Sequence, residues 1–78
     1  MKIKLTDKVL YNGLEGVIGK ELNAYVDDAI YVSLHPYAIV KGSELISAGA
    51  SEDDFDSTDE FIFINVNGHE EFVVCEEE

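Results

Sequence analysis

The sequence predicts a mostly β domain, either a small barrel or a curved antiparallel sheet, with an additional β-hairpin at its C-terminal end. Short runs rich in β-branched and aromatic residues alternate with residues typical of turns, which is the pattern of short strands. The dipeptide Asn67-Gly68 lies between two apolar runs, and this is the strongest short-range hairpin signal. Since no long segment repeats its apolar residues with helical periodicity, we expect no long helix.

Two strands are expected in the first part of the chain. Residues 8–11 form the first candidate and residues 16–22 the second, because each run contains β-branched and other apolar side chains. Asn12 and Gly13 lie between them and supply turn chemistry. The next reversal of the chain is expected at residues 27–28, where two aspartates follow one another.

Two further strands are expected before the middle of the chain. Residues 29–34 are rich in β-branched and aromatic side chains, and this strand should end before Pro36, which lacks the N–H group that a central strand needs. Residues 38–41 form the fourth candidate. Residues 42–46 form either one helical turn capped by Ser43 or a fifth strand, and we favour the strand.

Residues 61–75 form the predicted hairpin. A two-residue turn at Asn67-Gly68 would place Val66 opposite His69 and Phe63 opposite Phe72. Both faces of such a hairpin are apolar, whereas an ordinary surface hairpin has one polar face. Because large apolar patches are uncommon on soluble monomers, we expect a second copy to cover one face and form a homodimer. The contact residues would be Ile62, Ile64, Val66 and Val73.

The 78 residues are expected to form a single domain, 1–78, near the lower limit at which a core forms without disulfides or metals. Its parts would be strands in 1–46, a flexible acidic connection in 47–60 and the hairpin in 61–75. Apolar residues make up 46% of the chain and charged residues 28%, which is typical of a globular protein. A single cysteine, no signal-peptide pattern and no membrane-spanning apolar run favour a cytoplasmic location.

The charge is strongly negative and unevenly distributed. The net charge is −12, arginine is absent, and all five lysines precede residue 42. Most of the 17 carboxylates lie in the second half of the chain. Such a field repels nucleic acids and anionic membranes, whose binding depends on lysine and arginine. We therefore expect a basic protein as partner, no direct contact with nucleic acid and no membrane contact.

Residues 52–60 hold the densest group of carboxylates and are the candidate binding surface. Its members are Glu52, Asp53, Asp54, Asp56, Asp59 and Glu60. If the segment is extended, at about 3.3 Å per residue, its charges lie about 5 Å apart, close to the spacing of about 3.4 Å along one DNA strand. Phe55 would anchor it. The alternatives are a solvated loop that only confers solubility and a weak site for a divalent cation.

Known catalytic and metal-binding patterns are missing from the sequence. An EF-hand beginning at Asp54 would have Asp59 where glycine is needed and Asn65 where the bidentate glutamate is needed. His35, His69 and Cys75 lack the spacing of a zinc site, so we expect structural roles for them. Since no nucleophile–base pair or phosphate loop is present either, we expect neither an enzyme nor a cofactor. The four tyrosines are expected in the core or at a protein interface, namely Tyr11, Tyr25, Tyr31 and Tyr37.

Residues 7–18, DKVLYNGLEGVI, resemble the opening of small SH3-like barrels, including the KOW type. In those barrels a V-x-x strand, a glycine turn and a G-x-[VI] strand recur, and residues 41–46, KGSELI, resemble their closing segment. The likeness covers roughly half of the chain and implies an SH3-like fold. KOW domains generally bind RNA or other proteins, but this chain departs from the RNA-binding members in its lack of arginine and its excess of carboxylates.

By size and charge the chain also resembles the DNA-mimic and host-takeover inhibitors of bacteriophages. These occupy DNA-binding surfaces of enzymes, repressors or nucleoid proteins such as HU. The resemblance implies a non-catalytic inhibitor that imitates DNA phosphates and binds a basic nucleoid protein, polymerase, nuclease or repressor in the host cytoplasm. The alternative is a protein interaction or assembly module whose acidity serves solubility.

Overall fold

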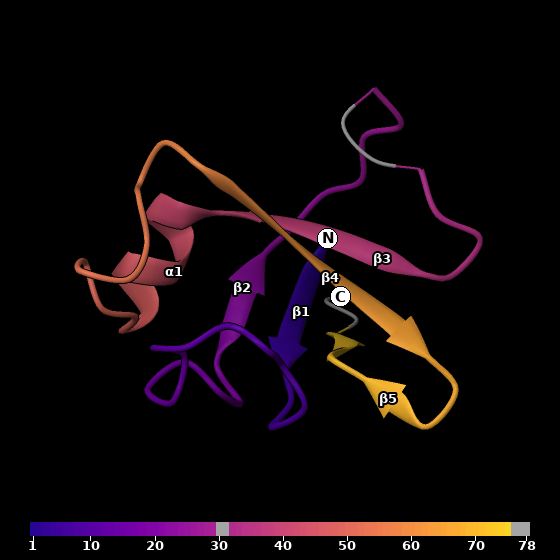
Figure 1. Ribbon diagram of the computed structural model, residues 1–78, viewed down its shortest axis with the longest axis horizontal. Helices are drawn as coiled ribbons and strands as arrows, with labels where there is room; N and C mark the ends of the chain where they lie inside the picture. The colour runs from indigo at the N-terminus through magenta and orange to yellow at the C-terminus, as the bar shows by residue number, and fades with distance from the viewer. Residues whose placement is uncertain (30–31, 76–78) are drawn as a thin grey trace.

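The computed structural model describes residues 1–29 and 32–75 (Figure 1). These residues form a mostly β fold, as predicted, together with one short helix. The strands form two three-stranded antiparallel sheets. The first sheet has the order β2-β1-β6, with β1 at Lys2–Leu5, β2 at Glu21–Asn23 and β6 at Phe72–Cys75. The second has the order β3-β4-β5, with β3 at Tyr37–Lys41, β4 at Glu60–Val66 and β5 at His69–Glu70. The helix α1 covers Gly42–Ala48.

The two sheets are joined at two corners. After β2 the chain passes to the second sheet, where Tyr25 and Ile39 exchange backbone hydrogen bonds of 2.9 and 2.7 Å. At the other corner β5 leads into β6 through Glu71, so one run of chain pairs first with β4 and then with β1. The core lies where the two sheets, α1 and the loop between β1 and β2 meet. Its largest fully buried side chains include Ile3, Leu14, Leu22, Leu45, Phe63 and Phe72.

The strand β1 was not predicted, although the residues of β1, KIKL, alternate between polar and apolar with the two-residue period of a half-buried strand. Ile3 and Leu5 are buried, and their neighbours Lys2 and Lys4 are only partly covered. The strand predicted at residues 8–11 is wrong. The chain turns after β1, and the Thr6 hydroxyl accepts a hydrogen bond of 3.2 Å from the Lys8 N–H group.

The strand predicted at residues 16–22 is largely wrong, since only its last two residues belong to β2. Before β2 the chain makes two turns, in which Val17 donates to the Leu14 carbonyl at 2.9 Å and Lys20 donates to the Val17 carbonyl at 3.0 Å. Gly19 has a φ of 84°, which favours glycine. Leu14 and Val17 therefore reach the core from turns rather than from a strand.

Of the strands predicted in the middle of the chain, only residues 38–41 are confirmed, within β3. Residues 30–31 of the predicted strand 29–34 lie outside the described residues, and its remaining residues form no strand. The strand favoured at residues 42–46 is wrong, because α1 covers them and Ser43 does not cap it. Gly42 packs so closely against the Asp56 carbonyl that a side chain would overlap it, and the helix buries Leu45.

The hairpin turn at Asn67-Gly68 is confirmed, with Val66 paired to His69. The register predicted beyond Glu70 is wrong, because β6 pairs with β1 and not with β4. The Asn65 side chain takes the place of the missing strand pairing. Its amide donates to the Phe72 carbonyl at 2.9 Å and accepts from the Phe72 N–H group at 3.1 Å. This pair marks the point at which the last strand leaves β4.

We expect Asn65→Ala to lower the free energy of unfolding by about 2 kcal/mol, because it leaves two partly buried backbone groups of Phe72 without partners. Urea denaturation followed by circular dichroism measures the change. Asn12→Ala, at an exposed turn residue, is the control and should change the stability by less than about 0.5 kcal/mol. Equal effects of the two substitutions would show that the Asn65 pair does not hold the corner.

Candidate functional site

Residues 51–59, called the acidic loop below, form two consecutive hydrogen-bonded turns between α1 and β4. In the first, the Ser51 carbonyl accepts from the N–H groups of Asp54 at 3.1 Å and Phe55 at 3.2 Å. In the second, the Asp56 carbonyl accepts from Asp59 at 3.0 Å. The expectation of an extended row of charges is therefore wrong, because each turn shortens the path of the chain.

The acidic loop is anchored to the rest of the fold by an aromatic side chain, by a backbone hydrogen bond and by a close contact of the Asp54 side chain with Gly13. Phe55 is only 5% exposed and packs edge-on against Phe61, with ring centroids 5.0 Å apart. The Gly42 N–H group donates to the Asp59 carbonyl at 2.8 Å. The Asp54 carboxylate lies so close to Gly13 that a side chain at that position would overlap it. The anchoring role expected for Phe55 is therefore confirmed.

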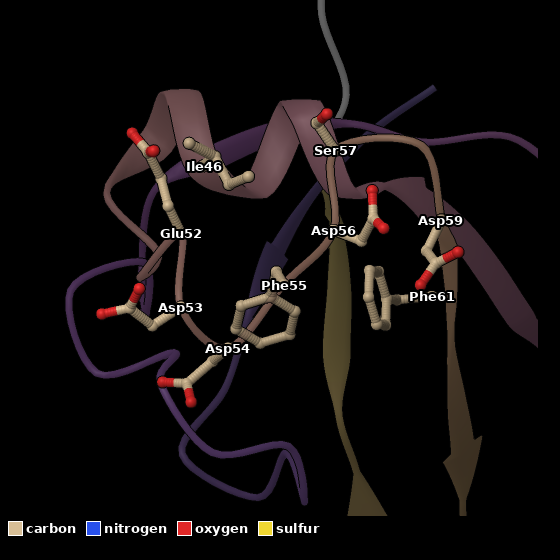
Figure 2. Close-up of a pocket in the computed structure, with 9 residues that line it drawn as sticks. All are labelled: Ile46, Glu52, Asp53, Asp54, Phe55, Asp56, Ser57, Asp59 and Phe61. Atoms are coloured by element: carbon tan, nitrogen blue, oxygen red, sulfur yellow. The ribbon is translucent and has the colours of Figure 1, made fainter.

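Five of the six predicted acidic residues surround a shallow pocket of about 670 Å³, called the acidic pocket below. They are Glu52, Asp53, Asp54, Asp56 and Asp59. Figure 2 shows Asp56 and Asp59 beside the Phe61 ring, and Glu52 and Asp53 on the other side of Phe55. The structure thus brings these five carboxylates together around one pocket and not along a line.

Glu60, the sixth predicted residue, does not line the acidic pocket. It lies in β4 opposite Lys41, and its carboxylate accepts a hydrogen bond from the Tyr25 hydroxyl. This hydrogen bond, together with burial and the charges of Glu60 and Asp27, raises the pKa of Tyr25 to about 12. Glu60 therefore has a structural partner, which sequence reasoning had not foreseen.

Asp56 also has a structural task, although it lines the acidic pocket. Its Oδ1 atom accepts from the Thr58 N–H group at 2.9 Å and from the Thr58 hydroxyl at 2.8 Å, and these bonds lower the pKa of Asp56. The remaining pocket carboxylates are exposed. Within residues 1–29 and 32–75 the only basic side chain within salt-bridge distance of a carboxylate is His69, whose Nε2 atom lies 3.1 Å from Glu71 Oε2. The acidic pocket thus carries negative charge that no lysine of this part of the chain neutralises by direct contact.

Among the described residues, metal-ligating side chains are not assembled into a site. In the part of the chain that the structure describes, no group of three or more histidine, cysteine, aspartate or glutamate side chains is arranged to hold a metal ion. Cys75 is a free, half-buried thiol at the end of β6. The His69 ring contacts one carboxylate oxygen of the buried Glu71 at 3.1 Å. The second carboxylate oxygen of Glu71 accepts a hydrogen bond of 2.9 Å from the Ile64 N–H group. These contacts are structural.

A second depression, called the Tyr11 groove below, runs along the outer side of β4. Its lining residues are Leu10, Tyr11, Ile62, Ile64 and Val66, with His69 and Glu71 at one end. Three of the four predicted contact residues of a dimer therefore share one surface. Val73 does not, because it lies in β6 opposite Lys4. Self-association stays a prediction, and the four residues do not form a single face.

Leu10 was missed as a surface residue, because the sequence assigned it to a strand, whereas Tyr11 was expected in the core or at a protein interface. Tyr11 packs edge-on against Phe61 and Phe63, with centroid distances of 5.5 and 5.4 Å, and its hydroxyl donates to the Ile62 carbonyl at 3.3 Å. The centroid of the Tyr11 ring also lies 6.4 Å from that of the Phe55 ring. Tyr11 therefore belongs to the wall between the acidic pocket and the Tyr11 groove, a position that only the tertiary structure reveals.

Comparison with known proteins adds no relative. No protein-family model, no curated protein and no solved structure matches the chain. Among residues 1–29 and 32–75, no helix has the length and apolar character needed to cross a membrane. The acidic pocket and the Tyr11 groove are therefore the features that indicate a function.

We expect Glu60→Gln to lower the pKa of Tyr25 from about 12 toward its ordinary value of 10.0, because the substitution removes the charge that favours the neutral phenol. The raised pKa means that neutral Tyr25 stabilises the fold, an effect present below about pH 10 and lost as the pH rises through 12. Ultraviolet titration of tyrosinate, with Tyr25→Phe to identify the signal, measures the shift. An unchanged titration in Glu60→Gln would contradict the assigned cause.

Proposed function

We propose that this chain is a non-catalytic acidic inhibitor, which occupies the basic surface of a nucleic-acid-binding protein with carboxylates in place of DNA phosphates. The observation that carries the proposal is the acidic pocket, where five carboxylates lie on one anchored loop. Exposed carboxylates attract the lysine and arginine side chains that otherwise hold phosphates, and arginine binds carboxylate and phosphate in the same two-pronged geometry.

Anchoring of the acidic loop favours this role energetically. A binding segment that is already ordered loses less conformational entropy on association than a loose polar tail does. The turns at Ser51 and Asp56 and the buried ring of Phe55 hold the loop backbone in place. The local density of negative charge in the acidic loop supports the proposal, whereas a straight row of charges with the spacing of DNA phosphates is not formed.

The charge of the whole chain supports the same partner class. A net charge of −12 accelerates the encounter with a basic protein and disfavours nucleic acid as a direct ligand. Likeness in size and charge to bacteriophage DNA mimics, and the small β scaffold, favour a nucleoid protein such as HU, a polymerase, a nuclease or a repressor as target, in the host cytoplasm. A relationship of the scaffold to SH3-like barrels of the KOW type is part of this proposal.

The second candidate is an interaction or assembly module that binds through the Tyr11 groove and whose acidity serves solubility. The observation that favours it is the exposed apolar lining of that groove. Salt distinguishes the two candidates. A carboxylate-dependent contact weakens steeply as ionic strength rises, whereas an apolar contact changes little.

The test measures displacement of a labelled DNA duplex from one member of each target class, by fluorescence anisotropy, at about 50 and about 200 mM salt. We expect displacement at the lower salt and a marked loss at the higher. Asp53→Asn with Asp54→Asn should weaken displacement about 2- to 30-fold, if each lost surface ion pair contributes about 0.2–1 kcal/mol.

The matched control is Asp27→Asn with Asp28→Asn, which removes the same charge from another exposed pair of aspartates. Asparagine keeps an oxygen that accepts from the Ala29 N–H group and from the Tyr37 hydroxyl, so this region should remain folded. The control should affect displacement less than the acidic-loop variant. Equal effects, or no displacement from any of the four target classes, would contradict the proposed function.

A further inference from the structure

The Tyr11 groove exposes apolar surface that the fold itself does not cover. Leu10 is 77% exposed, Tyr11 40% and Val66 36%, and half-buried Ile62 and Ile64 lie between them. Contiguous apolar surface of this kind on a highly charged chain is typical of an interaction site. Its shape, its hydrogen bonds and its surroundings together indicate which partner would cover it.

The spacing of the apolar residues suits a helix. Ile62, Ile64 and Val66 are alternate residues of β4 and therefore lie on one face, about 6.7 Å apart at the usual rise of a strand. Residues at positions i, i+4 and i+8 of an α-helix are about 6 Å apart along its axis. One apolar stripe of a helix therefore matches the row along β4.

Hydrogen bonding along this edge of β4 disfavours an added strand. The Ile62 carbonyl already accepts from the Tyr11 hydroxyl, and the Ile64 N–H group already donates to the Glu71 carboxylate. A pairing strand would have to displace both side chains. A helix satisfies its own backbone groups and needs only apolar contacts from the groove.

The acidic pocket next to the groove determines the charge of the occupant. Tyr11 and Phe61 contact one another, Phe61 lines the acidic pocket, and the next residue, Ile62, lines the groove. A helix that lies in the groove and extends across this wall would therefore bring the residues that flank its apolar stripe near Asp53, Asp54 and the other pocket carboxylates. Lysine and arginine are their electrostatic complement, whereas a second copy of the chain would add another charge of −12.

We propose that the Tyr11 groove binds an amphipathic helix rich in lysine or arginine, whose apolar stripe lies on β4 while its basic residues face the acidic pocket. This inference takes its basic partner from the proposed function and adds the part of the partner that is recognised. It also explains why one surface combines two different chemistries. Charge supplies attraction at a distance, and the apolar stripe supplies contact that persists at high salt.

The probe is a synthetic helical peptide of about 15 residues, with leucines at i, i+4 and i+8 and lysines along the flank of that stripe. In a titration followed by amide NMR, we expect chemical-shift changes at residues 10–11 and 62–66 and in the acidic loop. A peptide with serine in place of the leucines, and one with glutamate in place of the lysines, should each bind at least about tenfold more weakly.

Matched protein variants test the groove itself. Leu10→Ser with Val66→Ser removes two exposed apolar side chains from the groove, and we expect peptide binding to weaken about tenfold. Leu34→Ser with Val73→Ser makes the same two changes at exposed positions outside it and should leave peptide affinity unchanged. All four side chains are exposed by 36% or more, so both variants should keep the fold.

The inference is overturned by an absence of shifts in the groove or by equal affinities of the two variants for the peptide. It is also overturned if the serine or the glutamate peptide binds as tightly as the original peptide. Sedimentation equilibrium of the protein alone tests the rival occupant. A dimer that Leu10→Ser with Val66→Ser dissociates would assign the groove to a second copy and overturn the inference too. If the peptide binds but DNA is not displaced, the proposed inhibitor function is refuted and the groove proposal stands. If DNA is displaced but the peptide does not bind, the groove proposal is refuted and the inhibitor function stands.

Discussion

The departure of the last strand from β4 at Glu71 is the constraint on which the other features of this fold depend. A continuous hairpin would pair residues 72–75 with the first half of β4 and leave β1 without its partner β6. The Asn65 side chain permits the departure, because it bonds both backbone groups of Phe72 as a neighbouring strand would. The chain can thus join its two sheets without leaving these partly buried polar groups unsatisfied.

The freed edge of β4 explains both candidate surfaces. Tyr11 and Glu71 bond this edge in place of a strand, and the Tyr11 ring contacts the rings of Phe55, Phe61 and Phe63. These edge-on contacts hold the acidic loop on one side and leave the apolar groove open on the other. Carboxylates and apolar side chains therefore come to neighbouring positions because one aromatic cluster supports both.

The carboxylates divide into those that accept hydrogen bonds within the fold and those that contribute only surface charge, although they look alike in the sequence. Glu60 accepts from Tyr25, Asp56 closes a turn with Thr58, and Glu71 accepts from a backbone N–H group inside the bend. Each of these oxygens has a donor supplied by the fold. Asp53 and its exposed neighbours in the acidic loop form no ion pair within the described part of the chain, so they contribute charge at the surface.

Turn chemistry, β propensity and charge are local properties, and they were enough to predict the mostly β class, the turn at Asn67-Gly68, the strand at residues 38–41 and the crowding of acidic residues. The sequence also carried the alternation of β1, which our reading overlooked. Three features could be seen only in the folded structure. Residues 42–48 form the helix α1 where a strand was expected, β6 pairs with β1, and Tyr11 lies between an acidic pocket and an apolar groove. These outcomes depend on contacts between residues far apart in the chain, such as the packing of Gly42 against Asp56 and the bonds between Asn65 and Phe72 at the bend. Residue type does not specify such long-range partners. Local strand propensity therefore failed as a predictor where burial and backbone hydrogen bonding favour another structure, as at residues 42–46.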